Sequence, residues 1–508
     1  MKNFLAVALL LLPLCTTAQS SVTRYDLNPG KPRSFASNLY NYQDNLYFYA
    51  DNSSGLKRLW KFDHSTNTPK EIHPGTVYGN GLAFADPSSI CGLNGTIYFT
   101  AADIAHGLEL WKYDGVSPPS MVADINPNPK DGAAPNNHTV YGERIYFGAK
   151  NINNPKKQWE LYYYDLAKDT VLHVYQTSKG YKPGQIRYIT PYKNRLYFAA
   201  ETDSLGRELF YYDPATDSIA LVADIDTTNY YLSNPCNFTI VNGKFYFTAT
   251  NPTYGRELYE YDGDNPPVRL TDINKGAGHS FPVNIRHIIS FNNDLYFAAQ
   301  NKDTDIQLYK YSLTTAQTSL VHRINPTGSA HVSFLTLYRD SLYFAADDGV
   351  HGIELWKYNG ITNPVMVQDI RQGPLSSAPT EMIVIGKDMF FNATETATGW
   401  ELYKFTDTSI ATPNSITPVL TQKLSSNVYP NPTSGDSHIE LTLTHAQQLS
   451  ISVSNIEGRV VYQTPPTHYN KGKRSIYLPT KALPSGIYIY HIATESGLAI
   501  SSGKIEKQ

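Results

Sequence analysis

Five glutamates occupy the same place in successive segments of the chain and are the residues best suited to chemistry: Glu109, Glu208, Glu257, Glu354 and Glu401. Paired carboxylates can hydrolyse glycosidic bonds, one acting as acid and the other as base or nucleophile. An active site, however, is asymmetric and occurs once in a chain. A carboxylate that recurs in segment after segment is therefore predicted to build the structure, by accepting hydrogen bonds from backbone N–H groups of its own loop.

Other catalytic and metal-binding patterns are missing from the sequence. The histidines are scattered without an H-E-x-x-H pattern, and two cysteines in the mature chain cannot make a Cys-rich zinc site. Neither a G-x-S-x-G elbow nor a G-x-x-x-x-G-K-[ST] loop occurs. The loop of residues 103–109 lacks the alternating oxygen ligands of a calcium loop. We therefore predict no catalytic residue, no metal ion and no cofactor, although propeller enzymes do gather their residues from separate blades.

The recurrent acids belong to a repeat that an aromatic pair marks eight times. The first residues of the pairs lie 47 to 51 residues apart and are Tyr47, Tyr98, Tyr146, Tyr197, Tyr246, Tyr296, Tyr343 and Phe390. An alanine follows three residues after each marker, and most copies have the acid eleven residues after it. The fourth copy is assigned Glu160, three residues late through an insertion, whereas copies one and six have Arg58 and Gln307. Such a period is typical of a propeller or solenoid.

Each copy reads as four short strands separated by turn signals such as Asn242-Gly243, without the 3.6-residue period of an amphipathic helix. Radially repeated four-stranded units are β-propeller blades. The sequence therefore predicts an all-β, eight-bladed β-propeller of ~50-residue repeats over residues 22–405. Residues 22–30 match the end of a repeat, so we expect them to supply the outer strand of the last blade and close the ring. Residues 416–420 are the competing segment for that place.

The repeat resembles the "ELWxxDGT" family of bacterial surface and secreted propellers. The resemblance is best at residues 109–115, Glu-Leu-Trp-Lys-Tyr-Asp-Gly, and residues 354–360 depart from it only by Asn359 for Asp. It covers about three quarters of the chain and implies a propeller fold. It implies almost nothing about activity, because one fold hosts many functions.

The N-terminus predicts an exported protein. Residues 1–18 have the short basic and apolar regions of a signal peptide, with cleavage after Ala18, while Cys15 allows only a weak lipoprotein reading. No other apolar run is long enough to span a bilayer, so we expect no transmembrane segment and a soluble mature protein. The net charge of −3 argues against a nucleic-acid partner. Cys91 and Cys236 fall three blades apart, too far for a disulfide, and are predicted to be two buried thiols.

The repeat stops at residue 405, and residues 406–424 read as a Thr-, Ser- and Pro-rich linker. Alternating strands in residues 425–508 then predict a small Ig-like β-sandwich. This segment resembles the type A C-terminal sorting domain of the type IX secretion system of Bacteroidota. The sorting-motif residues that carry the resemblance are Tyr429, Pro430, Asn431, Pro432, Gly435, Gly458 and Gly486.

The second resemblance implies a route and a destination for the protein. The signal peptide would take the chain through the inner membrane, and the type IX secretion machinery would be its partner at the outer membrane. Removal of the sorting domain would follow, with either release or attachment to surface lipopolysaccharide. The expected location is therefore secreted or cell-surface attached, outside the outer membrane.

One position around the ring varies although its neighbour is nearly fixed. The residue before the recurrent acid ranges from Leu108 to Arg207 and is tryptophan at Trp159 and Trp400. If these belong to copies four and eight, they lie opposite one another, too far apart to hold one small molecule. They could engage an extended polymer, because aromatic rings offer a large contact area with a polar handle. Trp159 and Trp400 are thus the ligand-binding candidates; the alternative is that each covers its own loop.

Three functions are consistent with these patterns. The leading hypothesis is an exported, non-catalytic propeller that serves as a surface or secreted binding scaffold for a glycan or protein ligand. The rivals are a propeller hydrolase acting on polysaccharide or peptide, and a purely architectural surface protein. Acids or histidines unique to one or two blades would favour the enzyme, and exposed aromatic residues would favour binding. The ligand is expected on the face that carries loops 103–109 and 348–354, opposite the tight turns.

Overall fold

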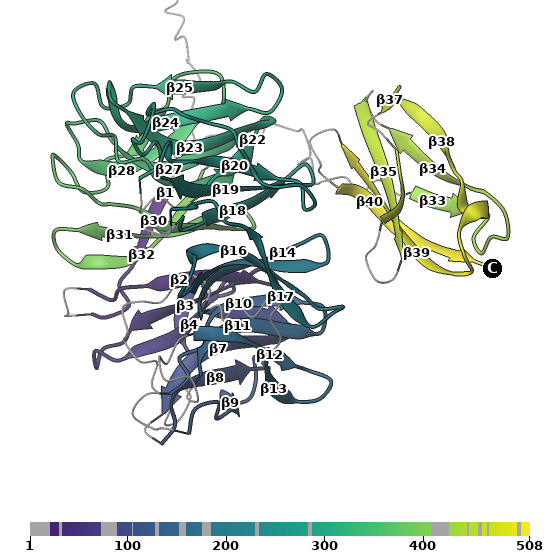
Figure 1. The fold of residues 1–508 in the computed structure, drawn as a ribbon, viewed down its shortest axis with the longest axis horizontal. Coiled ribbons are helices and arrows are strands. Elements are labelled where there is room, and N and C mark those ends of the chain that lie inside the picture. The colour runs from purple at the N-terminus through teal and green to yellow at the C-terminus, as the bar shows by residue number, and fades with distance from the viewer. Residues whose placement is uncertain are drawn as a thin grey trace, which may run out of the picture. The chain divides into compact units, whose positions relative to one another are not determined.

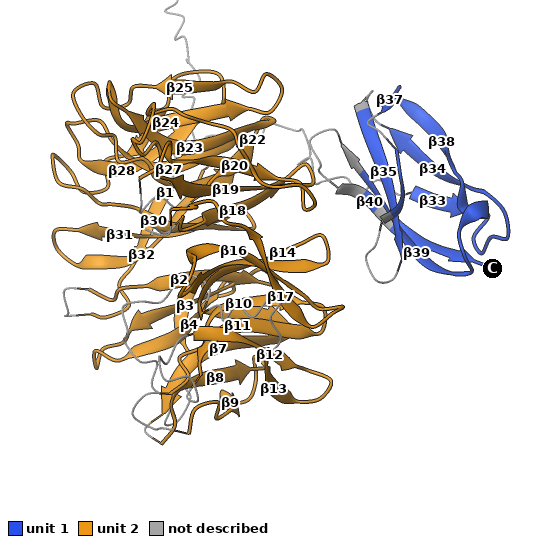
Figure 2. Ribbon diagram, viewed as in Figure 1, with its two compact units in different colours: residues 1–18, 409–508 blue, residues 19–408 orange. Residues whose placement is uncertain are grey.

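The computed structural model describes residues 21–508 except 30–32, 73–88, 104, 128–131, 152–158, 175–183, 229–232, 283–286, 408–425, 444–446, 456–459, 465–466 and 495–498. The chain forms two compact units, one of residues 19–408 and a second that contains residues 409–508 (Figure 2). The expected signal peptide with Ala18, nearly all of the expected linker, the closing segment 416–420 and Gly458 lie outside the described residues.

The strands of the first unit form eight four-stranded antiparallel sheets within the described residues, and the prediction of eight propeller blades is confirmed (Figure 1). Sheets one to four are, in order, β2 (Ser37–Tyr42), β3 (Asn45–Asp51), β4 (Lys57–Asp63) and β5 (Thr68–Glu71); β6 (Ile90–Leu93), β7 (Thr96–Asp103), β8 (Gly107–Tyr113) and β9 (Ser120–Ala123); β10 (Asn136–Tyr141), β11 (Arg144–Lys150), β12 (Trp159–Asp165) and β13 (Thr170–His173); β14 (Gly184–Tyr192), β15 (Arg195–Thr202), β16 (Gly206–Asp213) and β17 (Ser218–Ala223).

The other four sheets follow the same order, except that the last takes its outer strand from the N-terminus. They are β18 (Cys236–Val241), β19 (Lys244–Asn251), β20 (Gly255–Tyr261) and β21 (Val268–Arg269); β22 (Ile289–Phe291), β23 (Asp294–Asn301), β24 (Thr304–Ser312) and β25 (Thr318–His322); β26 (Ser333–Tyr338), β27 (Ser341–Asp347), β28 (Ile353–Tyr358) and β29 (Val365–Gln368); β30 (Thr380–Ile385), β31 (Asp388–Glu395), β32 (Gly399–Thr406) and β1 (Ser21–Tyr25).

Tight turns join the first and second strands of each sheet, as the sequence predicts. In the fifth sheet Asn242 and Gly243 have φ angles of 49° and 73°, the left-handed conformation that a two-residue hairpin of this kind needs. These turns define the tight-turn face of the ring. The hairpins between second and third strands, and the connections between sheets, define the opposite, loop face.

The hydrophobic core of the propeller lies between the sheets. Eight buried clusters each join two consecutive sheets, and the cluster around Phe48 and Phe390 joins the eighth sheet to the first, so the ring is closed. The alanine three residues after each marker is buried in all eight copies; Ala200, for example, has no exposed surface. A small residue there lets neighbouring sheets approach closely.

Ring closure uses the N-terminal segment. Strand β1 runs antiparallel to β32, from Ser21 opposite Thr406 to Tyr25 opposite Leu402, and Figure 1 shows it in purple among the green strands of the last sheet. Arg24 also donates a hydrogen bond to the Glu395 carboxylate. The prediction of N-terminal closure is therefore confirmed.

The second unit is a two-sheet β-sandwich, also as predicted. One sheet has the order β33-β34-β38 and the other β36-β35-β39-β40, with β37 paired to β35. The strands are β33 (Ser426–Tyr429), β34 (Ser437–Leu443), β35 (Gln447–Asn455), β36 (Val460–Gln463), β37 (Thr467–Tyr469), β38 (Gly472–Leu478), β39 (Gly486–Thr494) and β40 (Ala499–Lys507), with a short 3-10 helix at Thr480–Ala482. Alternate residues of β34 and β35, such as Leu441 and Ile451, form the core between the sheets.

Candidate functional site

The recurrent glutamates are buried and each accepts hydrogen bonds within the propeller, although Oε1 of Glu208 and of Glu401 has no partner among the described residues. Glu109 Oε2 accepts a hydrogen bond from Ile125 N at 3.0 Å, and Oε1 accepts from Asn126 N at 3.2 Å and Ala133 N at 2.8 Å. These donors belong to the connection between the second and third sheets. The carboxylate therefore ties that connection to its own blade, as the sequence predicts.

A serine from the following connection repeats this arrangement in four other blades. The Oγ–H groups that donate to the recurrent acids are those of Ser34, Ser233, Ser280 and Ser377, bound to Glu401, Glu208, Glu257 and Glu354. Burial raises the pKa of Glu109 to about 7, against the lowering effect of its N–H partners, and the same cause raises the pKa of Glu208, Glu257 and Glu401 to about 7. Perturbed acids can mark active sites, but a perturbation shared by four blades reports a common structural role.

The three copies without a glutamate eleven residues after the marker have Gln307, Arg58 and Glu160 instead, and each of these side chains has its own partners. Gln307, wholly buried in the sixth blade, accepts from Ile324 N at 2.9 Å and donates Nε2 to Asn325 O and Gly328 O at 3.1 and 3.0 Å. Arg58 Nε in the first blade lies 3.5 Å from Glu71 Oε1. Glu160 Oε2 lies 2.7 Å from His173 Nε2.

The candidate Trp159 does not lie in the fourth copy. Strand β12 pairs with β11, which carries the third marker Tyr146, so Trp159 and Glu160 belong to the third blade and the insertion delays them only locally. Trp400 is in the eighth blade. The two tryptophans are therefore three blades apart around the ring, and the expectation that they lie opposite is wrong.

Each candidate tryptophan is half-buried and contacts its own surroundings. Trp159 Nε1 donates to Ala134 O at 3.1 Å, and Lys150 Nζ lies 5.3 Å from the indole ring. The Trp400 carbonyl accepts from Ser34 N at 2.9 Å and Phe35 N at 3.3 Å. The Trp159 contact fits the covering role, and ligand binding by the pair stays a prediction.

The innermost strands carry a distortion that the sequence reasoning missed. Nine residues before the marker, seven blades place a non-glycine residue at positive φ; these are Asn38, Asn137, Tyr188, Asn237, His287, Phe334 and Glu381. Six of them coincide with a register shift between the first and second strands. The bulge joins neighbouring blades: Tyr188 N donates to Asn137 Oδ1 at 3.0 Å, and His287 N donates to Asn237 Oδ1 at 3.3 Å. Three asparagines at one register were the available signal, because asparagine tolerates this conformation.

Two hairpins of the loop face share a charged turn. In the second blade the Asp103 carboxylate accepts from His106 N at 2.7 Å and lies 2.8 Å from His106 Nδ1; in the seventh, Asp348 and His351 repeat both contacts at 2.9 and 2.8 Å. The carboxylate hydrogen bond raises the pKa of each histidine. Because both copies use the aspartate to hold the histidine and the turn, this pair also reads as structural.

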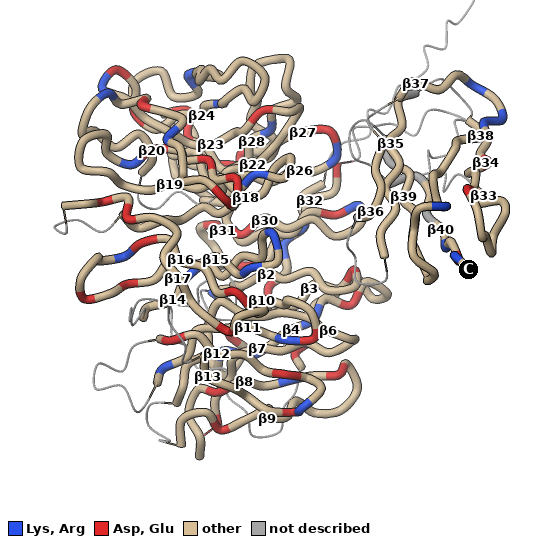
Figure 3. The backbone as a smooth tube through the Cα atoms, turned by 45° about the vertical axis from the view of Figure 1, so that its right-hand side comes forward, with Lys and Arg blue, Asp and Glu red and all other residues tan. Residues whose placement is uncertain are grey.

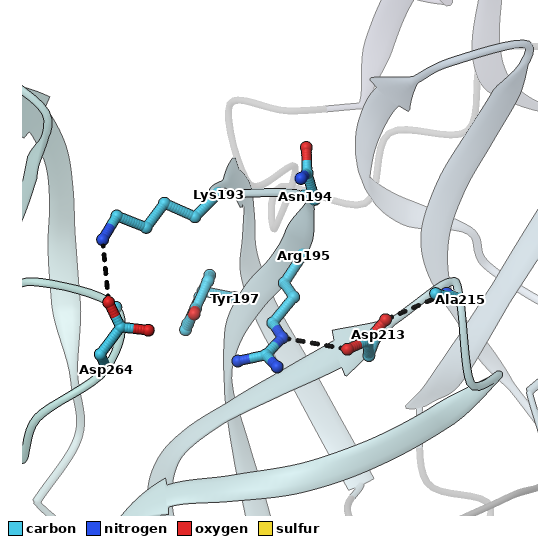
Figure 4. A pocket seen from close by; sticks show the side chains of 8 residues that line it. Lys193, Asn194, Arg195, Tyr197, Asp213, Ala215 and Asp264 are labelled. Carbon is cyan, nitrogen blue, oxygen red and sulfur yellow. Dashed lines mark hydrogen bonds and ion pairs between the residues drawn. The ribbon is translucent and has the colours of Figure 1, made fainter. Parts of the chain in front are cut away.

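A pocket of about 380 Å³ opens on the tight-turn face, between the fourth and fifth blades (Figure 4). Lys193 Nζ lies 3.2 Å from Asp264 Oδ2, and Arg195 Nε lies 3.1 Å from Asp213 Oδ2. The third blade repeats the second pair, with Arg144 Nε at 3.1 Å from Asp165. The sequence predicted a ligand on the opposite, loop face of the propeller. Both acidic side chains of the lining, Asp213 and Asp264, are thus held in ion pairs.

Both cysteines are free thiols, as expected, but only Cys91 is fully buried. Cys236, the first residue of β18, is half-buried. Within the described residues no group of three His, Cys, Asp or Glu side chains is placed to hold a metal ion. No helix among those residues is long and apolar enough to cross a membrane. Figure 3 shows basic and acidic residues interspersed through the propeller.

In the sandwich, hydrogen bonds hold the motif that begins at Tyr429 against the last strand, β40. Asn431 Nδ2 donates to Lys504 O and Glu506 N donates to Asn431 Oδ1, both at 2.7 Å. Thr433 N then donates to Glu506 O at 2.8 Å, and Thr433 pairs in parallel with Lys507. The asparagine side chain thus replaces a neighbouring strand along the edge of β40.

Residues 427–505 match the secretion system C-terminal sorting domain. This match supports handling by the type IX secretion machinery and indicates secretion or surface attachment. The matched range contains all seven residues of the predicted motif: Tyr429, Pro430, Asn431, Pro432, Gly435, Gly458 and Gly486. No curated protein matches the sequence.

Several solved structures are similar to the chain. A puromycin-hydrolyzing peptidase of Mycobacterium tuberculosis is 10% identical over 74% of this chain and 61% of its own, with a TM-score of 0.44. PorZ, a surface component of the type-IX secretion system of Porphyromonas gingivalis, is 12% identical over 92% and 64%, with a TM-score of 0.39. A fungal alcohol oxidase of the AA5 family is 9% identical over 97% and 100%, with a TM-score of 0.40. The chain thus spans less than two thirds of the first two structures.

Proposed function

We propose that the protein is a non-catalytic binding propeller that type IX secretion delivers to the cell surface or the medium of a member of the Bacteroidota. The observation that supports it most is the combination of a sorting domain with a propeller in which each recurrent glutamate accepts hydrogen bonds from a connection between blades. An exported protein meets ligands outside the cell. The recurrent glutamates, the residues that could serve in hydrolysis, already accept backbone and serine hydrogen bonds. Glycans and proteins are the ligand classes found there.

The delivery part is tested by deleting residues 425–508 in a host with a type IX system. The truncated protein should accumulate in the periplasm with its propeller folded, because the repeat ends before the sorting domain. The control is the full chain with Gln463→Ala, a change within the sandwich but outside the motif. Normal amounts of truncated protein in the medium would refute the assignment.

The binding part is tested by retaining the mature protein on a panel of immobilised polysaccharides and measuring released sugars in parallel. Retention without depolymerisation is expected. Depolymerisation would instead establish the hydrolase, and absence of binding to every glycan and protein tested would leave the architectural role. The double variant Trp159→Ala, Trp400→Ala is expected to bind an extended polymer more weakly; equal retention would remove these residues as candidates.

A further inference from the structure

Two arginines meet on the loop face between the fourth and fifth blades, and a third lies on the same face. Arg207 and Arg256 are the second residues of β16 and β20, and both hold Asn234 in the connection between the blades. Arg207 Nη1 donates to Asn234 Oδ1 at 2.8 Å, and Arg256 Nη1 donates to Asn234 O at 2.9 Å. Arg187 is exposed near the start of β14, which begins on the same face.

The positive charge of this cluster is only partly balanced. Arg207 lies 2.9 Å from Glu201 Oε2, the one ion pair that the three arginines make with described residues. Arg256 is 4% exposed, and its partners are neutral: Asn234 O and, at 3.2 Å, Cys236 Sγ. The Nε groups of Arg207 and Arg256 are buried without an acceptor among the described residues. A buried guanidinium without a counter-ion is costly, so an incoming anion would be stabilised here.

The cluster is not part of the blade pattern. Residues before the recurrent acid include Leu108, Ile306 and Ile353 in other blades, and arginine stands there only in two adjacent ones. In β15, Ala199 lies opposite Arg187 of β14. Two residues later, Glu201 lies opposite Arg207 of β16, so both arginines occupy the loop-face end of this sheet. Burial, and next the charge of Arg187, lower the pKa of Arg207. Unlike the glutamates, these side chains therefore occur once around the ring, as expected of a binding site.

An aromatic side chain lies beside these cations. Tyr188 follows Arg187 in β14, is 37% exposed, and packs edge-on against Phe238 of the next blade with ring centres 5.9 Å apart. Its bulged, left-handed backbone fixes its direction at the inner strand. A half-exposed ring next to guanidinium groups suits a sugar ring that carries a negative substituent, because the ring covers apolar sugar faces while arginine binds oxyanions through paired N–H groups.

We propose that Arg187, Tyr188, Arg207 and Arg256 form a binding site for the anionic group of a polysaccharide, a sulfate ester or a carboxylate. This inference rests on the proposed binding function and names its ligand class. Arg187 would contact the anion directly from the exposed rim. Arg207 and Arg256 lie deeper than Arg187 and would stabilise the anion by their positive charge and their buried N–H groups.

The test measures binding of the mature chain to dextran sulfate, carboxymethyl-dextran and unmodified dextran, which share one backbone. Retention by one or both anionic polymers but not by dextran is expected. Arg187→Ala should weaken that affinity about tenfold or more, the worth of one charge-assisted contact. The matched control is Arg323→Ala, an exposed arginine in a connection of the same face in the sixth blade, where it donates to Asp303 O. Equal thermal midpoints would confirm that both variants fold.

Equal affinity of the Arg187 and Arg323 variants for the anionic polymers would overturn the site. Retention of unmodified dextran with both variants unchanged would leave the proposed binding function standing and remove the anionic ligand. Polyglutamate is the acidic-peptide arm: Arg187-dependent binding of polyglutamate without binding of any dextran derivative would overturn the glycan in favour of a protein ligand. The relative retention by dextran sulfate and carboxymethyl-dextran identifies the preferred anion.

Discussion

Replacing Gln307 with glutamate tests why the sixth blade departs from the acid of its neighbours. The Gln307 amide nitrogen donates to two carbonyl oxygens, Asn325 O and Gly328 O, at 3.1 and 3.0 Å. In four other blades a serine hydroxyl donates a hydrogen bond to the carboxylate of the recurrent glutamate. The sixth blade has Ala330 in place of that serine. A carboxylate at position 307 would therefore face two acceptors and lose both bonds.

The expected cost follows from those two bonds. Each buried acceptor left without a donor costs about 1–3 kcal/mol, and one of the two carbonyls is only partly buried, so Gln307→Glu should destabilise the propeller by about 2–4 kcal/mol at pH 8. Burial against carbonyl oxygens should raise the pKa of the new carboxyl above its unfolded value of about 4.3. The protonated acid can still donate one bond, so the loss should be small near pH 4.5 and grow as the pH rises through the raised pKa.

Guanidinium unfolding followed by tryptophan fluorescence reports this change selectively, because all 5 tryptophans lie before residue 401 and none in the sandwich. Gln317→Glu is the matched control: the same substitution in the same blade at an exposed position. It should leave the midpoint unchanged at both pH values. Equal midpoints for the Gln307 variant and the control at pH 8 would refute the reasoning, as would a loss independent of pH.

Three further predictions concern closure, packing and pH. Removing residues 22–30 should lower the unfolding midpoint, because β32 loses four of its five pairing partners in β1; an unchanged midpoint would show that another segment closes the ring. Ala200→Leu should cost about 1–3 kcal/mol by overpacking a site with no exposed surface, and a parental midpoint would show that the site has spare room. The hydrogen bond to Asp348 raises the pKa of His351, so its stabilisation is complete below about pH 6.5 and lost as the pH rises through the raised value. His351→Ala should flatten the pH dependence of the midpoint in that window, and an unaltered profile would contradict this.

Much of the fold could be predicted from the sequence, because propeller blades are local structures. The marker pair, the alanine three residues later and turns such as Asn242-Gly243 report strands that pair with their neighbours in the chain. Closure was predictable as well, because residues 22–30 repeat the end of a blade. The structural role of Glu109 followed from its recurrence alone, without knowledge of its partners.

What lies between blades was decided only by the tertiary structure. Arg207 and Arg256 stand 49 residues apart in different blades, and no spacing rule brings both of them to Asn234. The bulges of the inner strands were not predicted from the sequence. Tyr188, for example, adopts a left-handed backbone that the local preference of a tyrosine disfavours. Trp159 was assigned to the wrong blade because an insertion obscured the count. Periodicity records contacts within a blade, where neighbours in the chain pair. Contacts between neighbouring blades join residues about one repeat apart in the chain. Which of those residues touch depends on how closely the two sheets pack.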